Sequence, residues 1–300
     1  MHKINIYNEK ERIELKTTYG ILTIDNIDIT PEKLEEYCSE ILFQKNNLEF
    51  IFNKDIACED DHISMIELFL PVDVDDDIRY FIEDSIKKNN NFYSFFAEAL
   101  LAVAFKDIYD YKLSSAAVDI NDTLIDSHTG ADACLYDEQN DVLILGEAKF
   151  YKKFSEGLDE IIQNFTEKGG FLNKLSSFYK RSKNNLESRS IIMKSLNKTD
   201  ITKIKLNEFL SLNIIYAGFV LHEHTGKVEK YTGEEFYNNF EISADKISKN
   251  IAETLGKEIE TNHKIILFHL PIKNKMELID KIIENAQKIR MDIQNENSCK

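Results

Sequence analysis

This sequence has few cysteines and no long apolar run, and these two features argue against a cysteine-rich metal site and a membrane span. The four cysteines stand far apart and lack the pair spacing of zinc sites, so we expect free thiols in a reducing cytoplasm. No apolar run approaches the roughly 20 residues that span a bilayer. The first ten residues lack the apolar core of a signal peptide. We therefore expect a cytoplasmic protein with no membrane partner.

Motifs for nucleotide-driven work are also missing. The sequence has no P-loop, no glycine-rich dinucleotide motif, no helicase motif and no internal repeat. Any strand separation or translocation in which this protein takes part must therefore come from another protein. Its 43% hydrophobic and 30% charged residues are typical of a folded chain. Its 300 residues suffice for about two domains.

Negative charge dominates the chain but is unevenly spread. The formal net charge of −16 argues against a surface that binds phosphate everywhere. Residues 149–205 nevertheless contain 13 Lys or Arg against 6 Asp or Glu. This basic segment is either an ordinary solvated face or a surface that follows a phosphate backbone. In the second case, the residues that bind nucleic acid are Lys152, Lys153, Lys174, Lys180, Arg181 and Lys183. The acidic remainder suits docking of a basic partner, or suppression of DNA binding by the free protein.

The most informative stretch is residues 130–151, GADACLYDEQNDVLILGEAKFY. Residues 130–136 and 142–145 are strand-like, and the polar residues between them predict a turn about Gln139–Asn140. The resulting antiparallel hairpin pairs Tyr136 with Leu143. Cys134 then packs as a small buried residue, which we prefer to a nucleophile.

The same register brings charged side chains together. It places Asp132 opposite Glu147, and Lys149 emerges two residues later on the same face as Glu147. Two facing carboxylates at the end of an apolar hairpin predict a bound cation. The alternative is an exposed hairpin whose charges face water, with Lys149 neutralising Glu147. A slip of one residue would turn Asp132 to the other face.

An upstream helix supplies a third carboxylate. Residues 92–105 are apolar almost all round, which predicts a buried helix, and Glu98 is their only charged residue. A buried charge is costly unless it is paired or binds a metal. Glu98 is therefore either a further metal ligand or a side chain that reaches solvent or meets a Lys or Arg.

This order of elements resembles the PD-(D/E)xK superfamily of restriction-endonuclease-like nucleases over residues 92–221. A helix with Glu98 is followed by strands at 112–120, at Asp132 and at Glu147–Lys149, by a helix, and by the strand Asn213–Leu221. The resemblance implies an α/β fold with an αβββαβ core. Ala131 stands where the proline that names the superfamily would be. Gln163 matches a glutamine of RecB-like members, but Glu167 replaces the tyrosine that should follow it, so Gln163 is a weak candidate.

The resemblance also implies roles for these residues. Asp132 and Glu147 would bind Mg²⁺, with Mn²⁺ as a substitute, and the Ala148 carbonyl and Glu98 would contribute. Lys149 would serve the attacking water. The carboxylates of Asp132, Glu147 and Glu98 and the carbonyl of Ala148 are hard oxygen ligands, which Mg²⁺ prefers. The catalytic set is Glu98, Asp132, Glu147 and Lys149.

More narrowly, the chain is similar to the HamA-type nuclease subunit of Hachiman antiphage systems, which works with a helicase partner, HamB. Residues 1–88 would form an N-terminal α/β region with a partner or regulatory role, and residues 89–300 the nuclease domain with a helix–strand–helix extension. We therefore expect a DNA-cleaving effector of a defence complex. The alternatives are an inactive nuclease fold that binds DNA as a scaffold, and a stand-alone restriction or repair nuclease.

The rest of the chain gives coarser predictions. Thr30-Pro31 starts a helix well, with Thr30 as cap and Pro31 as the first helical residue. The acidic run Val72–Asp77 lacks the glycine and the final Glu of a calcium loop, so it is a solvated connection. His222 and His224 are expected to form an exposed pair. We predict strands at Glu11–Ile24, Leu48–Phe52, Ser64–Leu70 and His263–Leu270, and helices at Ser155–Thr166, Ala244–Glu260 and Lys275–Ile293.

Overall fold

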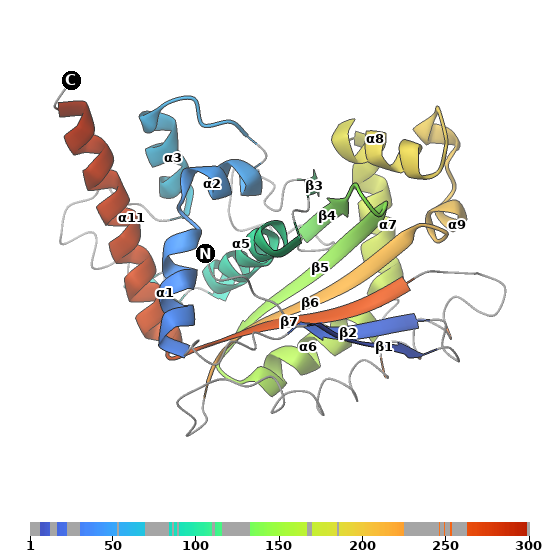
Figure 1. Cartoon of the computed structure of the whole chain (residues 1–300), viewed down its shortest axis with the longest axis horizontal. Coiled ribbons are helices and arrows are strands. Elements are labelled where there is room, and N and C mark those ends of the chain that lie inside the picture. The colour runs from blue at the N-terminus through green and yellow to red at the C-terminus, as the bar shows by residue number, and fades with distance from the viewer. Residues whose placement is uncertain are drawn as a thin grey trace.

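A mixed β-sheet with helices on both faces forms the body of the protein (Figure 1). The computed structural model describes residues 7–12, 17–22, 31–52, 54–69, 84–85, 87–88, 90–109, 112–115, 133–166, 170–184, 186–224, 246, 249, 253 and 263–298. Within these residues, seven strands form one sheet in the order β1-β2-β7-β6-β5-β4-β3. The helices in this part of the chain are all too short or too polar to cross a membrane.

The middle of the chain has the predicted order of helix, three strands, helix and strand. These elements are α5 (Asn90–Tyr109), β3 (Lys112–Ser115), β4 (Ala133–Asp137), β5 (Val142–Tyr151), α6 (Phe154–Thr166) and β6 (Asn213–Glu223). Between α6 and β6 lie α7 (Gly170–Asn184), α8 (Leu186–Ser195), a 3₁₀ turn (Ile201–Lys203) and α9 (Leu206–Phe209). The α/β fold expected from the sequence is confirmed.

The last predicted strand and helix are also confirmed, as β7 (His263–Ile272) and α11 (Lys275–Ser298). The predicted helix Ala244–Glu260 lies almost wholly outside the described residues, and the acidic run Val72–Asp77 lies wholly outside them. Strands β3, β4 and β5 form an antiparallel meander, whereas β6 and β7 run parallel to β5. The two faces of β5 are both covered, which explains its nearly continuous apolar sequence.

Each face of β5 belongs to a different apolar core. Ile144, Ala148 and Phe150 pack with α5 on one face. Leu143 and Leu145, which alternate with them, pack with α6 and α7 on the other. Because side chains alternate along a strand, Glu147 and Lys149 share the face of Leu143 and Leu145. The site residues of β5 therefore lie on the side of the sheet that α6 and α7 cover.

Residues before 70 differ most from the sequence predictions. The predicted strand Glu11–Ile24 is two strands, β1 (Tyr7–Arg12) and β2 (Thr17–Leu22). Leu48–Phe52 and Ser64–Leu70 are not strands but parts of helices α2 (Lys45–Phe52) and α3 (Glu59–Phe69). Both runs are short and apolar, and such runs have no periodicity that separates a buried helix from a strand. Helix α1 (Pro31–Ile41) begins at Pro31 as predicted, while Thr30 lies outside the described residues.

The predicted domain boundary after residue 88 divides neither the sheet nor the core. Strand β2 pairs in parallel with β7, so the early strands extend the central sheet. Buried side chains of α1, such as Leu34, belong to the same core as Phe96 of α5 and Ile279 of α11. Glu35 adds a polar contact, because its carboxylate accepts hydrogen bonds from the Asn274 amide at 2.8 Å and from Lys281 Nζ at 2.5 Å.

Candidate active site

The β4–β5 hairpin has the register that the sequence predicts. Tyr136 pairs with Leu143, and Ala133 pairs with Gly146 at the end of the described strand. The Asp137 carboxylate caps the turn by accepting hydrogen bonds from the amides of Gln139 at 3.0 Å and Asn140 at 3.2 Å. The alternative of an exposed hairpin is wrong in its exposure, because β5 is buried from residue 143 to residue 148. Its pairing of Lys149 with Glu147 is present, with Nζ and Oε1 2.9 Å apart.

Glu147 is the most unusual residue of this hairpin, since it is a carboxylate only 3% exposed. Its Oε1 accepts a hydrogen bond from Asn164 Nδ2 at 2.5 Å and lies 2.9 Å from Lys149 Nζ. Its Oε2 accepts a hydrogen bond from Lys174 Nζ. Lys174 is itself buried, at 8% exposure. Two ammonium groups and an amide therefore surround one buried carboxylate.

The charge state of Glu147 follows from this environment. Burial alone raises the pKa of the Glu147 carboxyl, because it disfavours the charged form. The ammonium groups of Lys174 and Lys149 outweigh burial, and the pKa lies below its ordinary value. Glu147 is therefore an anion at neutral pH, positioned to interact with positive charge.

A line of polar side chains leads from Glu147 toward the surface. Lys149 Nζ, 2.9 Å from Glu147, is also 3.4 Å from Glu160 Oε1 on α6. The Tyr151 hydroxyl donates a hydrogen bond to the other oxygen of Glu160. The exposed fraction of the side chain rises from 4% for Glu147 to 15% for Lys149 and 35% for Glu160. The buried carboxylate is thus approached through Lys149.

Sequence analysis missed three residues of this cluster. Glu160 and Asn164 both come from α6, four residues apart, which puts them on one helical face toward β5. Gln163, the residue chosen from the family pattern, is exposed. The spacing of Glu160 and Asn164 was a usable signal, because the buried residues of α6, Leu158, Ile161, Ile162 and Phe165, identify the face that meets the sheet.

Lys174 is the third residue, and it was expected on a basic surface. Instead it points inward from α7, and Nζ lies 5.5 Å from the centre of the Phe165 ring. Gly170 allows this placement, because a Cβ there would lie 2.3 Å from the Asn164 carbonyl oxygen. Helix α7 can therefore begin directly against the end of α6. No sequence pattern shows that contact.

The other predicted ligands are Asp132, Glu98 and Ala148, of which the structure describes Glu98 and Ala148. Asp132 lies outside them, so its pairing with Glu147 stays a prediction. Glu98 is half-buried on α5, and that helix covers the opposite face of β5 from the Glu147 side chain. Ala148 is buried in β5 between Glu147 and Lys149. Within the described part of the chain, no three His, Cys, Asp or Glu side chains group closely enough to hold a metal.

The other predicted nucleic-acid contacts are mostly exposed. Lys152 and Lys153 follow β5 directly, with side chains 73% and 65% exposed. Lys180 and Lys183 are exposed on α7, and Lys183 Nζ lies 4.2 Å from the centre of the Tyr179 ring. Arg181 lies on the same helix. These four lysines are exposed, whereas Lys174 is buried.

The two histidines beyond the predicted strand do not form an exposed pair. His222 is 1% exposed, and its ring stacks on His269 of β7 with centres 5.4 Å apart. Nε2 of His222 lies 3.1 Å from Nδ1 of His269. Burial lowers the pKa of His222 to about 4 and that of His269 well below its ordinary value, so both rings are neutral at pH 7. The strand was predicted to end at Leu221, and in the structure it extends to Glu223.

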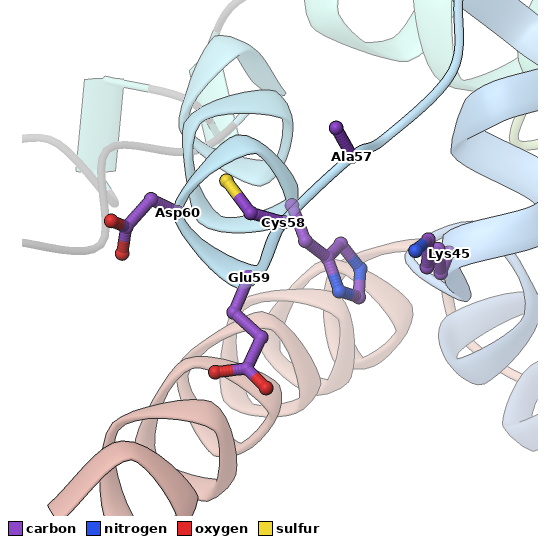
Figure 2. A pocket seen from close by; sticks show the side chains of 6 residues that line it. Lys45, Ala57, Cys58, Glu59 and Asp60 are labelled. Carbon is purple, nitrogen blue, oxygen red and sulfur yellow. The ribbon is translucent and has the colours of Figure 1, made fainter.

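A surface pocket of about 350 Å³ lies elsewhere, at the start of α3. Figure 2 shows Cys58, Glu59 and Asp60 on one side and Lys45 on the other. His62 also lines the pocket, and its Nε2 lies 2.9 Å from the Phe43 carbonyl oxygen. These side chains are mostly exposed and of mixed charge. The pocket has no buried anion comparable to Glu147.

Comparison with known proteins identifies the family. Searches of curated proteins and of solved structures gave no match. A family model, described as HamA, matches residues 49–286, which include α5, the β4–β5 hairpin, α6, α7 and strands β6 and β7. The match covers well over half of the chain and supports the narrower of the two resemblances drawn from the sequence. The chain belongs to the HamA family.

Proposed function

We propose that this HamA-family protein is a metal-dependent nuclease that hydrolyses DNA phosphodiester bonds as the effector of a Hachiman complex with a helicase partner. Family membership associates the chain with Hachiman antiphage defence. The observation that carries the nuclease proposal is the pair Glu147 and Lys149, which share one face of a buried strand 2.9 Å apart. This arrangement suits a site where a bound cation and an ammonium group act on one phosphate.

Among the described residues, the Glu147 carboxylate is the type of ligand that binds a magnesium ion. Mg²⁺ is usually held by one or two carboxylates with waters and substrate phosphate completing its shell. Glu147 supplies an ionised carboxylate, for which a metal would compete with the ammonium groups of Lys174 and Lys149. Asp132 and the Ala148 carbonyl are the further ligands we propose, whereas Glu98, on the helix that covers the opposite face of β5, is not retained as a ligand. When bound, the metal would lower the pKa of a water molecule and stabilise charge on the phosphate.

Among the described residues, Lys149 would act most directly on the phosphate. Its ammonium lies between the buried Glu147 and the half-exposed Glu160, so it can meet a phosphate that enters from the surface. There it would orient the attacking water or balance the negative charge that develops on phosphorus. Glu160, held by the Tyr151 hydroxyl, restricts where that ammonium can lie.

The exposed lysines beside the site would hold the DNA backbone. Lys153 is paired with Glu156 at 2.8 Å, and Lys152 lies 3.9 Å from Glu223. Such surface pairs contribute little stability, about 0–1 kcal/mol, so a phosphate can replace the carboxylates at small cost. With Lys180, Arg181 and Lys183 they make up the DNA contact surface that we propose.

The partner follows from what the chain lacks. A sequence with no P-loop or helicase motif needs another protein to separate strands or move along DNA. The excess of negative charge outside residues 149–205 would limit DNA binding by the free protein. We therefore propose that a helicase-type partner delivers the DNA.

The test is cleavage of plasmid and linear DNA by the purified chain, alone and with its partner, in Mg²⁺, in Mn²⁺ and in EDTA. Glu147→Gln keeps the size of the side chain, and Lys149→Met keeps most of its length. Lys273→Met removes an exposed lysine that is paired with Glu277 at 3.8 Å and serves as the control. We expect cleavage by the wild type and the control, and a loss of at least about a hundredfold in the two site variants.

Other outcomes separate the alternatives. Binding of DNA without cleavage under every condition would favour an inactive scaffold subunit. Full activity without any partner would favour a stand-alone nuclease. Wild-type rates in folded Lys149→Met would sink the assignment of the site.

A further inference from the structure

Lys174 is a buried cation that the proposed chemistry does not require. Lysine is seldom buried without a partner, because removing its charge from water is costly. Here the partner is Glu147, equally buried, and the contact is with Oε2 of the carboxylate. The opposite oxygen, Oε1, already receives Asn164 and Lys149. The two lysines therefore approach different oxygens of one carboxylate.

This division of the carboxylate has a chemical meaning. Asn164 and Lys149 hold Oε1 from α6 and from β5 itself, which fixes the rotamer of Glu147. Oε2 is held by Lys174. An oxygen of this carboxylate can receive two partners, as Oε1 does, so a cation that uses Oε2 competes with the Lys174 ammonium through charge repulsion. Two positive charges at one oxygen would repel each other strongly in a buried site.

The fold places Lys174 firmly but on a separate helix. Its neighbour Leu175 and Phe178, one turn further on, are fully buried in the core beneath α7. The lysine stem itself is flexible, with four carbon atoms between the backbone and Nζ. The ammonium can therefore leave Oε2 while the helix stays in place.

We propose that Lys174 is a positioning residue that occupies the cation-binding oxygen of Glu147 in the metal-free protein and yields it when a divalent cation binds. The inference deepens the proposed function, because it takes Glu147 as a metal ligand. It differs from the family pattern, which requires Glu147 and Lys149 but assigns nothing to α7. The displaced ammonium remains beside the site, where it can contribute to balancing the charge of a phosphate.

The experiment measures metal binding without DNA, by calorimetric titration of the full chain with MnCl₂ and MgCl₂. Lys174→Met keeps the apolar stem and removes the charge, and Lys273→Met is the control. We expect Lys174→Met to bind Mn²⁺ at least about tenfold more tightly than the wild type, and the control to remain within about twofold of it. The double variant Glu147→Gln/Lys174→Met should lose the gain.

Three results would overturn the inference. These are unchanged affinity in Lys174→Met, a gain that persists in the double variant, and absence of Mn²⁺ binding in both the wild type and Lys174→Met. Lys174→Gln, which can still donate a hydrogen bond to Oε2, takes the place of Lys174→Met if the latter does not fold. It should show a gain in the same direction.

A second readout uses the wild type alone. A crystal structure with Mn²⁺ should show Oε2 on the metal and Lys174 Nζ beyond hydrogen-bonding distance of it. A lysine that remains on Oε2 beside a bound Mn²⁺ would refute displacement. If affinity rises in Lys174→Met but no protein cleaves DNA, the nuclease proposal fails and the inference about Lys174 stands.

Discussion

Two buried polar clusters lie on the central strands, and they are held in opposite ways. Around Glu147 the groups are charged, and the ammonium groups of Lys149 and Lys174 balance a carboxylate. The rings of His222 and His269 are neutral and stacked, and Nε2 of His222 lies 3.1 Å from Nδ1 of His269. Phe154, whose ring centre lies about 5 Å from both, covers the histidine pair.

The difference bears on which cluster suits the chemistry that we propose. An ionic cluster can exchange one cation for another, because a buried carboxylate is costly when unpaired and is stabilised again by a second positive charge. A neutral pair packed under an aromatic ring gains nothing from charge and loses stability when it is protonated. We therefore place the chemistry at Glu147 and a structural role at His222 and His269.

The strongest way to break the ionic cluster is Glu147→Ala. It leaves the buried ammonium of Lys174 without its partner, so we expect a loss of about 3–5 kcal/mol in the free energy of unfolding. Glu147→Gln should lose clearly less, since its amide oxygen still accepts a hydrogen bond. Urea denaturation of both variants provides the measurement. Both variants remove the negative charge, so equal losses would mean that the hydrogen bond kept by the Gln amide oxygen contributes nothing.

Acid should break the neutral pair. His222 has a folded-state pKa of about 4, below the ordinary value of about 6.5, so the unfolded chain binds more protons between these values. The stabilisation is complete above pH 6.5 and is lost as the pH falls toward 4, by roughly 3 kcal/mol. The free energy of unfolding, measured by denaturation at several pH values in this range, should depend more steeply on pH in the wild type than in His222→Leu/His269→Leu. Parallel pH profiles would contradict a buried neutral pair.

A backbone change should disturb the ionic cluster alone. Gly170→Ala puts a Cβ against the last turn of α6, and the resulting shift of α7 should cost about 1–3 kcal/mol. Because Lys174 moves with α7, Mn²⁺ affinity should change as well, whereas the pH profile of the histidine pair should not. Gly157→Ala, whose Cβ would meet the Val220 side chain at 2.7 Å and the Tyr151 side chain at 3.5 Å, is the comparison variant on α6. The idea fails if both variants change Mn²⁺ affinity equally.

The smallest expected effect comes from Tyr151→Phe. It removes the hydrogen bond to Glu160 at the half-exposed rim, which should cost about 0.5–1.5 kcal/mol. Cleavage should fall only modestly, because Lys149 keeps its contact with Glu147. A collapse of activity comparable to that of Lys149→Met would show that Glu160 takes a larger part in the site than its exposure indicates.

Much of the fold was predictable because its signals are local. The apolar helix α5, the hairpin register about Gln139–Asn140 and the strand β6 all follow from continuous apolar runs and turn residues. Helices α2 and α3 were predicted as strands because a short apolar run fits either structure. The pairing of β2 with β7 joins segments near opposite ends of the chain, and no local pattern carries that information.

The candidate site was predictable only along its own strand. Glu147 and Lys149 lie two residues apart, so strand alternation alone puts them on one face. Asn164, Glu160 and Lys174 reach the same place through the packing of α6 and α7, which depends on Gly170 and on core contacts. Lys174 looked like a surface charge because the sequence around it is basic.

The parallel pairing of β2 with β7 also sets an order of events during synthesis. Thr17 lies beside His263 in the finished sheet. At about 5–20 residues per second, a ribosome needs tens of seconds to make the chain between them. For that time the β1–β2 hairpin has no sheet to join, and an isolated two-stranded hairpin is marginally stable in water at best. The strand made early thus waits for one made more than two hundred residues later, and β1 and β2 can join the sheet in this way only after β7 has been made.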